Sequence, residues 1–135
     1  MLGEPIGESR GQVTGTRVLP FEGQAPKIEV SFRSTGKLLA IDYTELGTYW
    51  ATPLPEGFWF GEGQGVITTK DGEIVTWRGQ GAGKPTGKGS GARWRGAVFC
   101  HTSSPNLARL NGIAVVFEHE TDENGNVHTK LWEWK

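Results

Sequence analysis

Apolar and polar residues alternate with a period of two along almost the whole chain, which predicts β-strands. Gly and Pro interrupt this alternation so often that the longest stretch free of both is 113–124, and that stretch also alternates. The predicted turns are 22–26, 35–36, 53–57, 70–72, 84–91, 104–112 and 124–125. They separate eight predicted strands at 6–19, 27–34, 37–50, 58–69, 73–83, 92–103, 113–122 and 127–134.

The connections between these strands are short and follow the order of the chain, which favours antiparallel neighbours. Eight such strands can close on themselves and leave no free edge. We therefore predict an all-β fold, an eight-stranded antiparallel up-and-down β-barrel that forms one domain over residues 1–135.

Two segments also have helical features. Between residues 104 and 111, Ser104 can cap and Pro105 suits a first helical position, so at most one helical turn is expected there, with Leu107 and Leu110 turned inward. The other segment is 37–46, where apolar residues share a helical face. Its β-branched and aromatic residues favour a strand instead.

The dipeptide Asn124-Gly125 is a strong two-residue hairpin signal. A hairpin closed there pairs Thr121 with His128, His119 with Lys130, Phe117 with Trp132 and Val115 with Trp134. It places Ile113, Val115, Phe117, Trp132 and Trp134 on one face, and Glu118, Glu120, Thr129 and Glu133 on the other. The predicted register thus separates apolar from mainly acidic residues, as a half-buried sheet requires.

The middle of the chain is unusually rich in glycine and polar residues, in the segments 61–65 and 77–81. A three-residue loop at 70–72, with Gly72 in the left-handed region, sets the register of the two strands. It places Gln64 opposite Arg78, Glu62 opposite Gln80 and Gly65 opposite Trp77. The glycines at 61, 63 and 65 then share one face, and Glu62 and Gln64 share the other.

Two interpretations of this polar face remain open. In the first, it is solvated, and the glycines let a small barrel bend and let Trp77 lie over bare backbone. In the second, the polar side chains point into the barrel and form a small-molecule site beside aromatic rings. That candidate ligand-binding site consists of Phe58, Phe60, Glu62, Gln64, Arg78, Gln80 and Trp94. Glu62, held ionised near Arg78, is its candidate catalytic residue.

Composition narrows the function classes. The 14 basic and 15 acidic side chains give a net charge of −1, which argues against a general polyanion binder. A single cysteine excludes an internal disulfide and suits a reducing compartment. No apolar run is long enough for a transmembrane helix, and the first residues show no secretory signal, so we expect a cytoplasmic protein without membrane association.

Other candidate chemistry is weaker. The segment 83–90 departs from the phosphate-loop pattern at both its first glycine and its final hydroxyl residue. The cations of 84–95 surround Trp94 and could form a weak surface for single-stranded nucleic acid.

Three histidines, two of them expected on one face of the last hairpin, suggest no metal site. Cys100 and His101 point to opposite faces, and Cys100 is expected in the core. We expect no cofactor.

Three segments carry a resemblance to the allene oxide cyclase-like barrels of the calycin group, including small bacterial members. They are 61–72, which begins Gly-Glu-Gly-Gln-Gly-Val, then 77–81, Trp-Arg-Gly-Gln-Gly, and 107–112, Leu-Ala-Arg-Leu-Asn-Gly. The resemblance covers most of the chain and implies an eight-stranded antiparallel barrel, often a dimer or trimer. The plant cyclases of the group fold an oxylipin inside an apolar barrel with a carboxylate and a bound water. Their functional residues do not align one by one with this chain, so the activity is not transferred.

These observations support three functional hypotheses. The first is a barrel that binds a small apolar or amphipathic molecule, with cyclase or isomerase activity left open by analogy. The second is a barrel filled by its own side chains that acts as a homo-oligomer, a dimer or trimer, or as an interaction module. The third is weak binding of single-stranded nucleic acid through residues 84–95.

Overall fold

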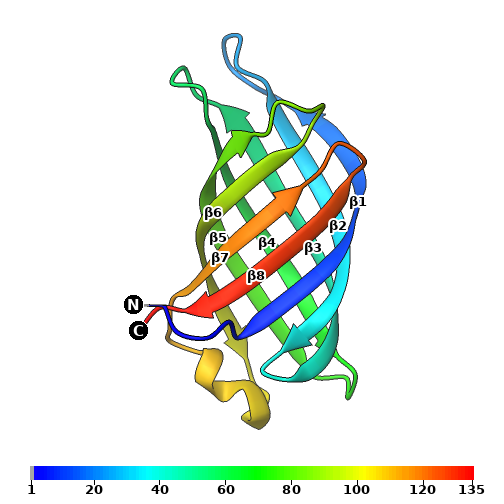
Figure 1. The fold of residues 1–135 in the computed structure, drawn as a ribbon, viewed down its shortest axis with the longest axis vertical. Helices are drawn as coiled ribbons and strands as arrows, with labels where there is room; N and C mark the ends of the chain where they lie inside the picture. The colour runs from blue at the N-terminus through cyan, green and yellow to red at the C-terminus, as the bar shows by residue number, and fades with distance from the viewer. Residues whose placement is uncertain (1) are drawn as a thin grey trace.

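The computed structural model describes residues 2–135 and consists of eight antiparallel strands that close into a barrel in chain order, β1 to β8 (Figure 1). The strands are β1 (Gly7–Leu19), β2 (Lys27–Leu38), β3 (Ile41–Pro53), β4 (Trp59–Thr69), β5 (Ile74–Pro85), β6 (Ala92–Thr102), β7 (Val115–Thr121) and β8 (Asn126–Glu133). The predicted fold class is confirmed. Within the described residues, no helix has the length and apolar character needed to cross a membrane.

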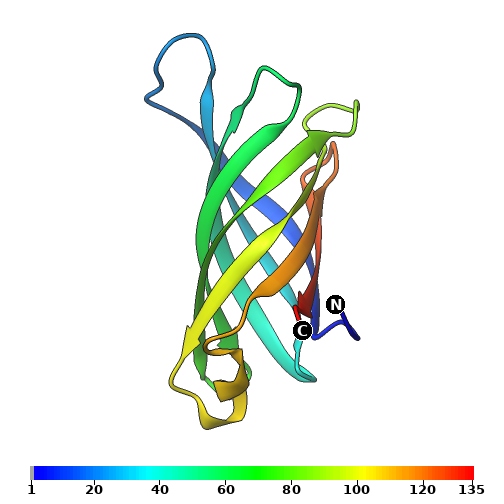
Figure 2. The same ribbon diagram turned by 90° about the vertical axis from the view of Figure 1, so that its left-hand side faces the viewer.

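A short 3-10 helix, η1 (Pro105–Leu110), connects β6 to β7 at the end of the barrel where both chain termini lie (Figures 1 and 2). Pro105 begins it, as predicted, and its two leucines are fully buried. Ser104 makes no capping hydrogen bond, contrary to the prediction, because its hydroxyl donates to the Glu73 carboxylate instead.

The leucines of η1 close this end of the barrel. They form an apolar cluster with four buried strand residues, Leu38, Tyr43, Ile67 and Val75. Burial of a side chain of this size contributes about 1.5–3 kcal/mol each, so the cluster is a major part of the core. We call it the apolar plug.

The hairpin between β4 and β5 has the predicted register. Residues 70–72 form its loop, Gly72 has a φ of 82°, and the Thr69 amide donates to the Glu73 carbonyl. Gln64 lies opposite Arg78, Glu62 opposite Gln80 and Gly65 opposite Trp77, as predicted.

The register predicted for the last hairpin is wrong by one residue. The Asp122 amide donates to the Asn126 carbonyl, so the loop has three residues, 123–125, with Gly125 at a φ of 82°. His119 therefore lies opposite Thr129 and Phe117 opposite Leu131, instead of Lys130 and Trp132. The shift follows from the side chain of Asp122, which accepts hydrogen bonds from the amides of 124 and 126. Because a one-residue slip exchanges the faces of a strand, Thr129 turns inward and Trp132 and Trp134 turn outward.

The turn predicted at 35–36 does not exist. β2 continues to Leu38, and the chain reverses at Leu39 and Ala40, whose φ values are 50° and 68°. Turns of this hand suit the twist of a two-residue hairpin, although Gly or Asn is the usual residue there. Gly36 serves another purpose: a Cβ on it would lie 2.0 Å from the Glu8 carbonyl oxygen, so it lets β1 approach β2 closely.

Substituting Ala40→Gly should raise the free energy of unfolding by about 0.5–1 kcal/mol. The left-handed conformation costs an L-residue about 1–2 kcal/mol, and the greater freedom of glycine in the unfolded chain offsets only part of the gain. Urea denaturation measures the change. Ala97→Gly, in a strand position without a positive φ, is the matched control and should be destabilising. Equal losses in both variants would contradict this account of the turn.

Candidate functional site

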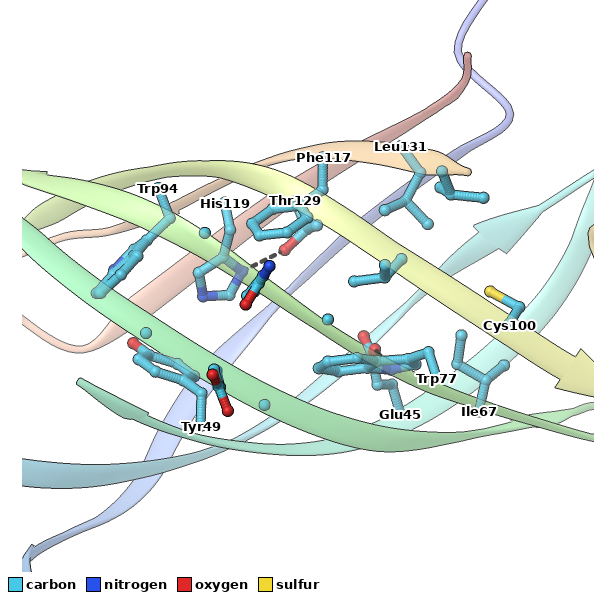
Figure 3. Close-up of a pocket in the computed structure, with 18 of the residues that line it drawn as sticks. Glu45, Tyr49, Ile67, Trp77, Trp94, Cys100, Phe117, His119, Thr129 and Leu131 are labelled. Carbon is cyan, nitrogen blue, oxygen red and sulfur yellow. Dashed lines mark hydrogen bonds between the residues drawn. The ribbon is translucent and has the colours of Figure 1, made fainter. Parts of the chain in front are cut away.

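Between the apolar plug and the other end of the barrel lies a cavity of about 90 Å³ with a mostly apolar lining (Figure 3). Its walls come from inward-facing side chains of nearly every strand. The larger of these are Phe32, Tyr49, Trp77, Trp94, Phe117 and Leu131. Polar groups at the cavity are few, and the two most buried are Glu45 and His119.

Glycines of β4 and β5 leave room for the cavity. Gly61, Gly63, Gly79 and Gly81 all line it, and as residues without side chains they present only backbone to the interior. Further along the same strands, Trp77 lies across Gly65, where an added Cβ would come within 2.4 Å of the indole ring. The alternating glycines therefore both admit a large aromatic ring and hold the barrel open beside it.

Glu45, on β3, is a buried carboxyl group that is only 8% exposed. The Ser34 hydroxyl donates to its Oε1 at 2.8 Å, and the Trp77 indole N–H donates to its Oε2 at 2.7 Å. Burial raises the pKa of Glu45, and these two hydrogen bonds oppose the rise. The group is thus positioned on two sides and faces an apolar space, where a carboxyl can hold a proton at a higher pH than it does in water.

We expect the stability of the native protein, relative to Glu45→Gln, to fall as the pH rises above about 4.5. The folded state holds the Glu45 proton more tightly than the unfolded chain, since its pKa is raised on folding. This stabilisation has its full value below the pKa of Glu45 in the unfolded chain. It decreases as the pH rises to the pKa of Glu45 in the folded protein, with a slope of at most about 1.4 kcal/mol per pH unit. Urea denaturation of both proteins between pH 4 and pH 8 measures the difference.

Glu62→Gln is the matched control for this measurement, because Glu62 is an exposed glutamate on the neighbouring strand. It should show no comparable pH-dependent difference. A flat difference between the native protein and Glu45→Gln across the range would contradict a raised pKa for Glu45.

The second buried polar group, His119 of β7, belongs to a cluster of four rings, which we call the ring cluster: Phe32, Tyr49, Trp94 and His119. Figure 3 shows Tyr49, Trp94 and His119 at the end of the cavity away from Ile67 and Cys100. The centroid of the His119 ring lies 5.0 Å from that of Phe32 and 6.0 Å from that of Tyr49. Its Nδ1 lies 2.7 Å from the Thr129 hydroxyl, whereas its Nε2 has no hydrogen-bond partner. Burial lowers the pKa of His119 to about 4, so the imidazole is neutral at pH 7.

Burial also raises the pKa of two further groups at the cavity, Tyr49 and Cys100. Burial raises the pKa of Tyr49 to about 12. Burial, with a smaller contribution from the Glu45 charge, raises the pKa of Cys100 to about 11. Cys100 lines the cavity as the predicted inward residue of β6 but is a thiol, not a reactive thiolate, at neutral pH.

The polar residues predicted for the site do not point into the barrel. Glu62, Gln64, Arg78 and Gln80 all have exposed side chains on the outer face, and alternation puts the glycines between them inside. Glu62 and Gln80 border the cavity only beside these inward glycines. The inward interpretation is therefore wrong, and the solvated one, with Trp77 over bare backbone, is supported. The physical reason is that Ile67 and Val75 lie on the same face of their strands as the glycines, and both are buried in the apolar plug.

Of the three predicted aromatic residues, only Trp94 is at the cavity, and its contact with a ligand remains a prediction. Phe60 points outward, where its ring lies 6.0 Å from that of Trp50. Phe58 precedes β4 and does not line the cavity.

Sequence reasoning missed Glu45 and His119. A signal for Glu45 exists: it shares strand parity with Tyr43 and Tyr49, two large aromatic residues that also turn inward. His119 lies on the same face of its strand as Val115 and Phe117, but the wrong register paired it with Lys130. The predicted placement of His119 and His128 on one face is also wrong, because His128 lies outside, 2.6 Å from the Glu8 carboxylate.

The basic segment predicted as a nucleic-acid surface is partly neutralised. Arg93 and Arg95 of β6 lie 3.9 Å and 3.4 Å from the carboxylates of Glu120 and Glu118 on β7. These exposed pairs weaken the case for a cationic surface, and nucleic-acid binding stays a prediction. Among residues 2–135, no group of three or more His, Cys, Asp or Glu side chains is arranged to hold a metal ion.

Comparison with known proteins supports the fold and leaves the activity open. No protein-family model matches the chain, and no curated protein matches it. The barrel superposes on a conserved protein of unknown function from Rhodopseudomonas palustris, with a TM-score of 0.81, 13% identity, and coverage of 98% of this chain and 97% of the other. A beta-barrel like protein from Acinetobacter baumannii gives a TM-score of 0.82 at 15% identity, covering 100% and 96% of the two chains.

A third similar structure is described as an enzyme from Penicillium herquei. It has a TM-score of 0.69 and 16% identity, and the match covers 96% of this chain and 92% of that one. At these identities the likeness extends to the eight-stranded barrel alone, since one fold hosts many unrelated functions. The allene oxide cyclase-like family is therefore not established by these matches.

Proposed function

We propose that this protein binds a small apolar or amphipathic molecule inside its barrel. The observation that carries the proposal is the cavity of about 90 Å³, lined by large apolar side chains and supplied with two buried polar groups, Glu45 and His119. A mostly apolar space with a few convergent polar groups is the usual form of a small-molecule site.

The size of the cavity limits the part of the ligand that it accepts. An engineered protein cavity of about 150 Å³ binds benzene, so a space of 90 Å³ suits a smaller group. We therefore propose a five-membered ring or a short branched chain as the group that the cavity holds.

Isomerase-type chemistry extends this proposal through Glu45 in place of the predicted Glu62. Glu45 is the buried carboxyl of the cavity, and two donors hold its oxygens in place. A carboxyl with a raised pKa in an apolar site is suited to accept a proton from a bound ligand and return it at another atom. The resemblance to cyclase barrels and the enzyme from Penicillium herquei with the same fold are the other support.

A thermal-shift screen of small ring and branched-chain compounds tests the binding proposal. A ligand present at 100 times its dissociation constant stabilises the folded state by about 2.7 kcal/mol, an increase in Tm on the order of 10 °C at this chain length. Val98→Ile, which adds one methylene at the cavity wall, should raise the Tm without ligand and reduce the ligand-induced shift. If no small compound shifts the Tm of the native protein, the binding proposal fails.

A second candidate function, association with a second copy of the chain, is favoured by an apolar groove on the outer surface. Leu2, Val116, Trp132 and Trp134 line it, and Leu2 and Trp134 are 51% and 64% exposed. Exposed apolar groups gathered in this way are typical of interaction surfaces. Sedimentation of the native protein and of Trp134→Arg tests this function: a concentration-dependent oligomer that the substitution dissociates supports it, and a monomer in both excludes it.

A further inference from the structure

One buried nitrogen atom in the ring cluster lacks a partner. His119 is 6% exposed, its Nδ1 is hydrogen-bonded to Thr129, and its Nε2 has no hydrogen bond. Buried polar atoms are nearly always paired in folded proteins, because an unmade hydrogen bond is costly away from water. His119 is one of the residues that line the cavity, so this nitrogen belongs to a side chain at the cavity wall (Figure 3).

The surroundings of this nitrogen are aromatic. Phe32 and Tyr49 contact the imidazole, and Trp94 meets the Tyr49 ring nearly edge-on, with 5.5 Å between centroids. A flat aromatic ring is the kind of group that packs against such rings at the same angles.

The tautomer of His119 decides whether its Nε2 is a donor or an acceptor of a hydrogen bond. The faces of neighbouring rings carry partial negative charge, which favours an N–H directed among them over a lone pair. In the tautomer with a proton on Nε2, the Thr129 hydroxyl donates to Nδ1, which lies 2.7 Å away. His119 then offers one unused N–H donor to the cavity.

We infer that the ring cluster is a subsite for a flat ring carrying a hydrogen-bond acceptor, an aza-nitrogen or a carbonyl oxygen, which accepts from His119 Nε2–H. This inference rests on the proposed function and specifies the chemical class of its ligand. It assigns recognition of the acceptor to His119, whereas Glu45 lies at the end of the cavity nearer Ile67 and Cys100 (Figure 3).

Three small rings of similar size test the inference. Thiazole and thiophene differ by one nitrogen in place of a C–H group, and pyrrole offers a donor instead of an acceptor. Affinities are measured by NMR titration of the native protein, and the ¹⁵N shifts of His119 report its tautomer and the hydrogen bond directly. We expect the Nε2–H tautomer, and about fivefold tighter binding of thiazole than of thiophene or pyrrole.

Two substitutions complete the test. His119→Phe keeps a ring of similar shape without the donor and should abolish the preference for thiazole. His101→Phe, which replaces an exposed histidine on β6, is the matched control and should retain it. If His119→Phe does not fold, the tautomer and the ring preference of the native protein decide the question by themselves.

The possible results separate the two proposals. Equal binding of thiazole and thiophene, tighter binding of pyrrole, or a proton on Nδ1 overturns the inference and leaves the binding function intact. Failure of all three rings to bind overturns the inference, and the thermal-shift screen of the branched-chain compounds then decides the binding function separately.

Discussion

Substituting Gly65→Ala should lower the free energy of unfolding by about 3 kcal/mol, at the upper end of what overpacking costs in protein cores. A Cβ at this position would lie 2.4 Å from atoms of the Trp77 indole. The indole has little freedom to move away, because its N–H is hydrogen-bonded to Glu45 at 2.7 Å and the ring packs against the apolar plug. Urea denaturation of the variant measures the loss.

A double-mutant cycle with Trp77→Ala identifies the cause of that loss. If the clash with the indole is responsible, Gly65→Ala should cost about 2 kcal/mol less once Trp77 has been removed. Gly15→Ala is the matched control: nothing lies within 4 Å of its added Cβ, and the stability should change by less than about 1 kcal/mol. Equal costs of Gly65→Ala with and without Trp77 would show that the indole does not require the glycine.

Between pH 6.5 and pH 4, we expect His119 to reduce the stability of the native protein by about 3 kcal/mol. Burial lowers its pKa from 6.5 to about 4, so over this range the unfolded chain takes up a proton that the folded protein does not. Stability is therefore lost as the pH falls, by about 1.4 kcal/mol for each unit of pKa difference. Acid unfolding followed by tryptophan fluorescence, combined with urea denaturation at each pH, measures the loss.

His119→Phe isolates this contribution from that of Glu45, which has the opposite sign. The variant loses the hydrogen bond to Thr129 at every pH, and this gives a constant offset. Only the pH-dependent part of the difference reports the imidazole. His101→Phe serves again as the control on an exposed histidine and should follow the native profile. A difference between native protein and His119→Phe that stays constant from pH 4 to pH 7 is the outcome that excludes a lowered pKa.

The barrel was predictable because local patterns agree with it along the chain. Glycine and proline exclude long helices, alternation marks the strands, and the loop at 70–72 sets the register of β4 and β5. The two errors in the predicted turns also have local causes. Asp122 extends a two-residue turn to three through hydrogen bonds of its side chain. Leu39 and Ala40 form a left-handed turn without glycine, while Gly36 lies within a strand.

The candidate site was far less predictable, although its residue types are common ones. The alternation of side chains along a strand indicates that Glu62 and Gly61 face opposite sides of the sheet. It does not indicate which side is the interior of the barrel. A glutamate between glycines looks like a functional group beside a pocket. In the barrel the glycines face inward, since Trp77 needs the space above Gly65, and the glutamate faces water.

The sequence by itself determined the number of strands, their antiparallel order and most of their pairing, because turns and alternation are properties of neighbouring residues. Only the tertiary structure decided which face of each strand lines the interior, and with it the inward positions of Glu45 and His119. Closure of the sheet makes that choice, because large inward rings need space and glycine provides it: a Cβ on Gly65 would meet the Trp77 ring, and a Cβ on Gly83 would meet the Trp94 ring. Glu45 and His119 are held inside by hydrogen bonds with Ser34 and Thr129.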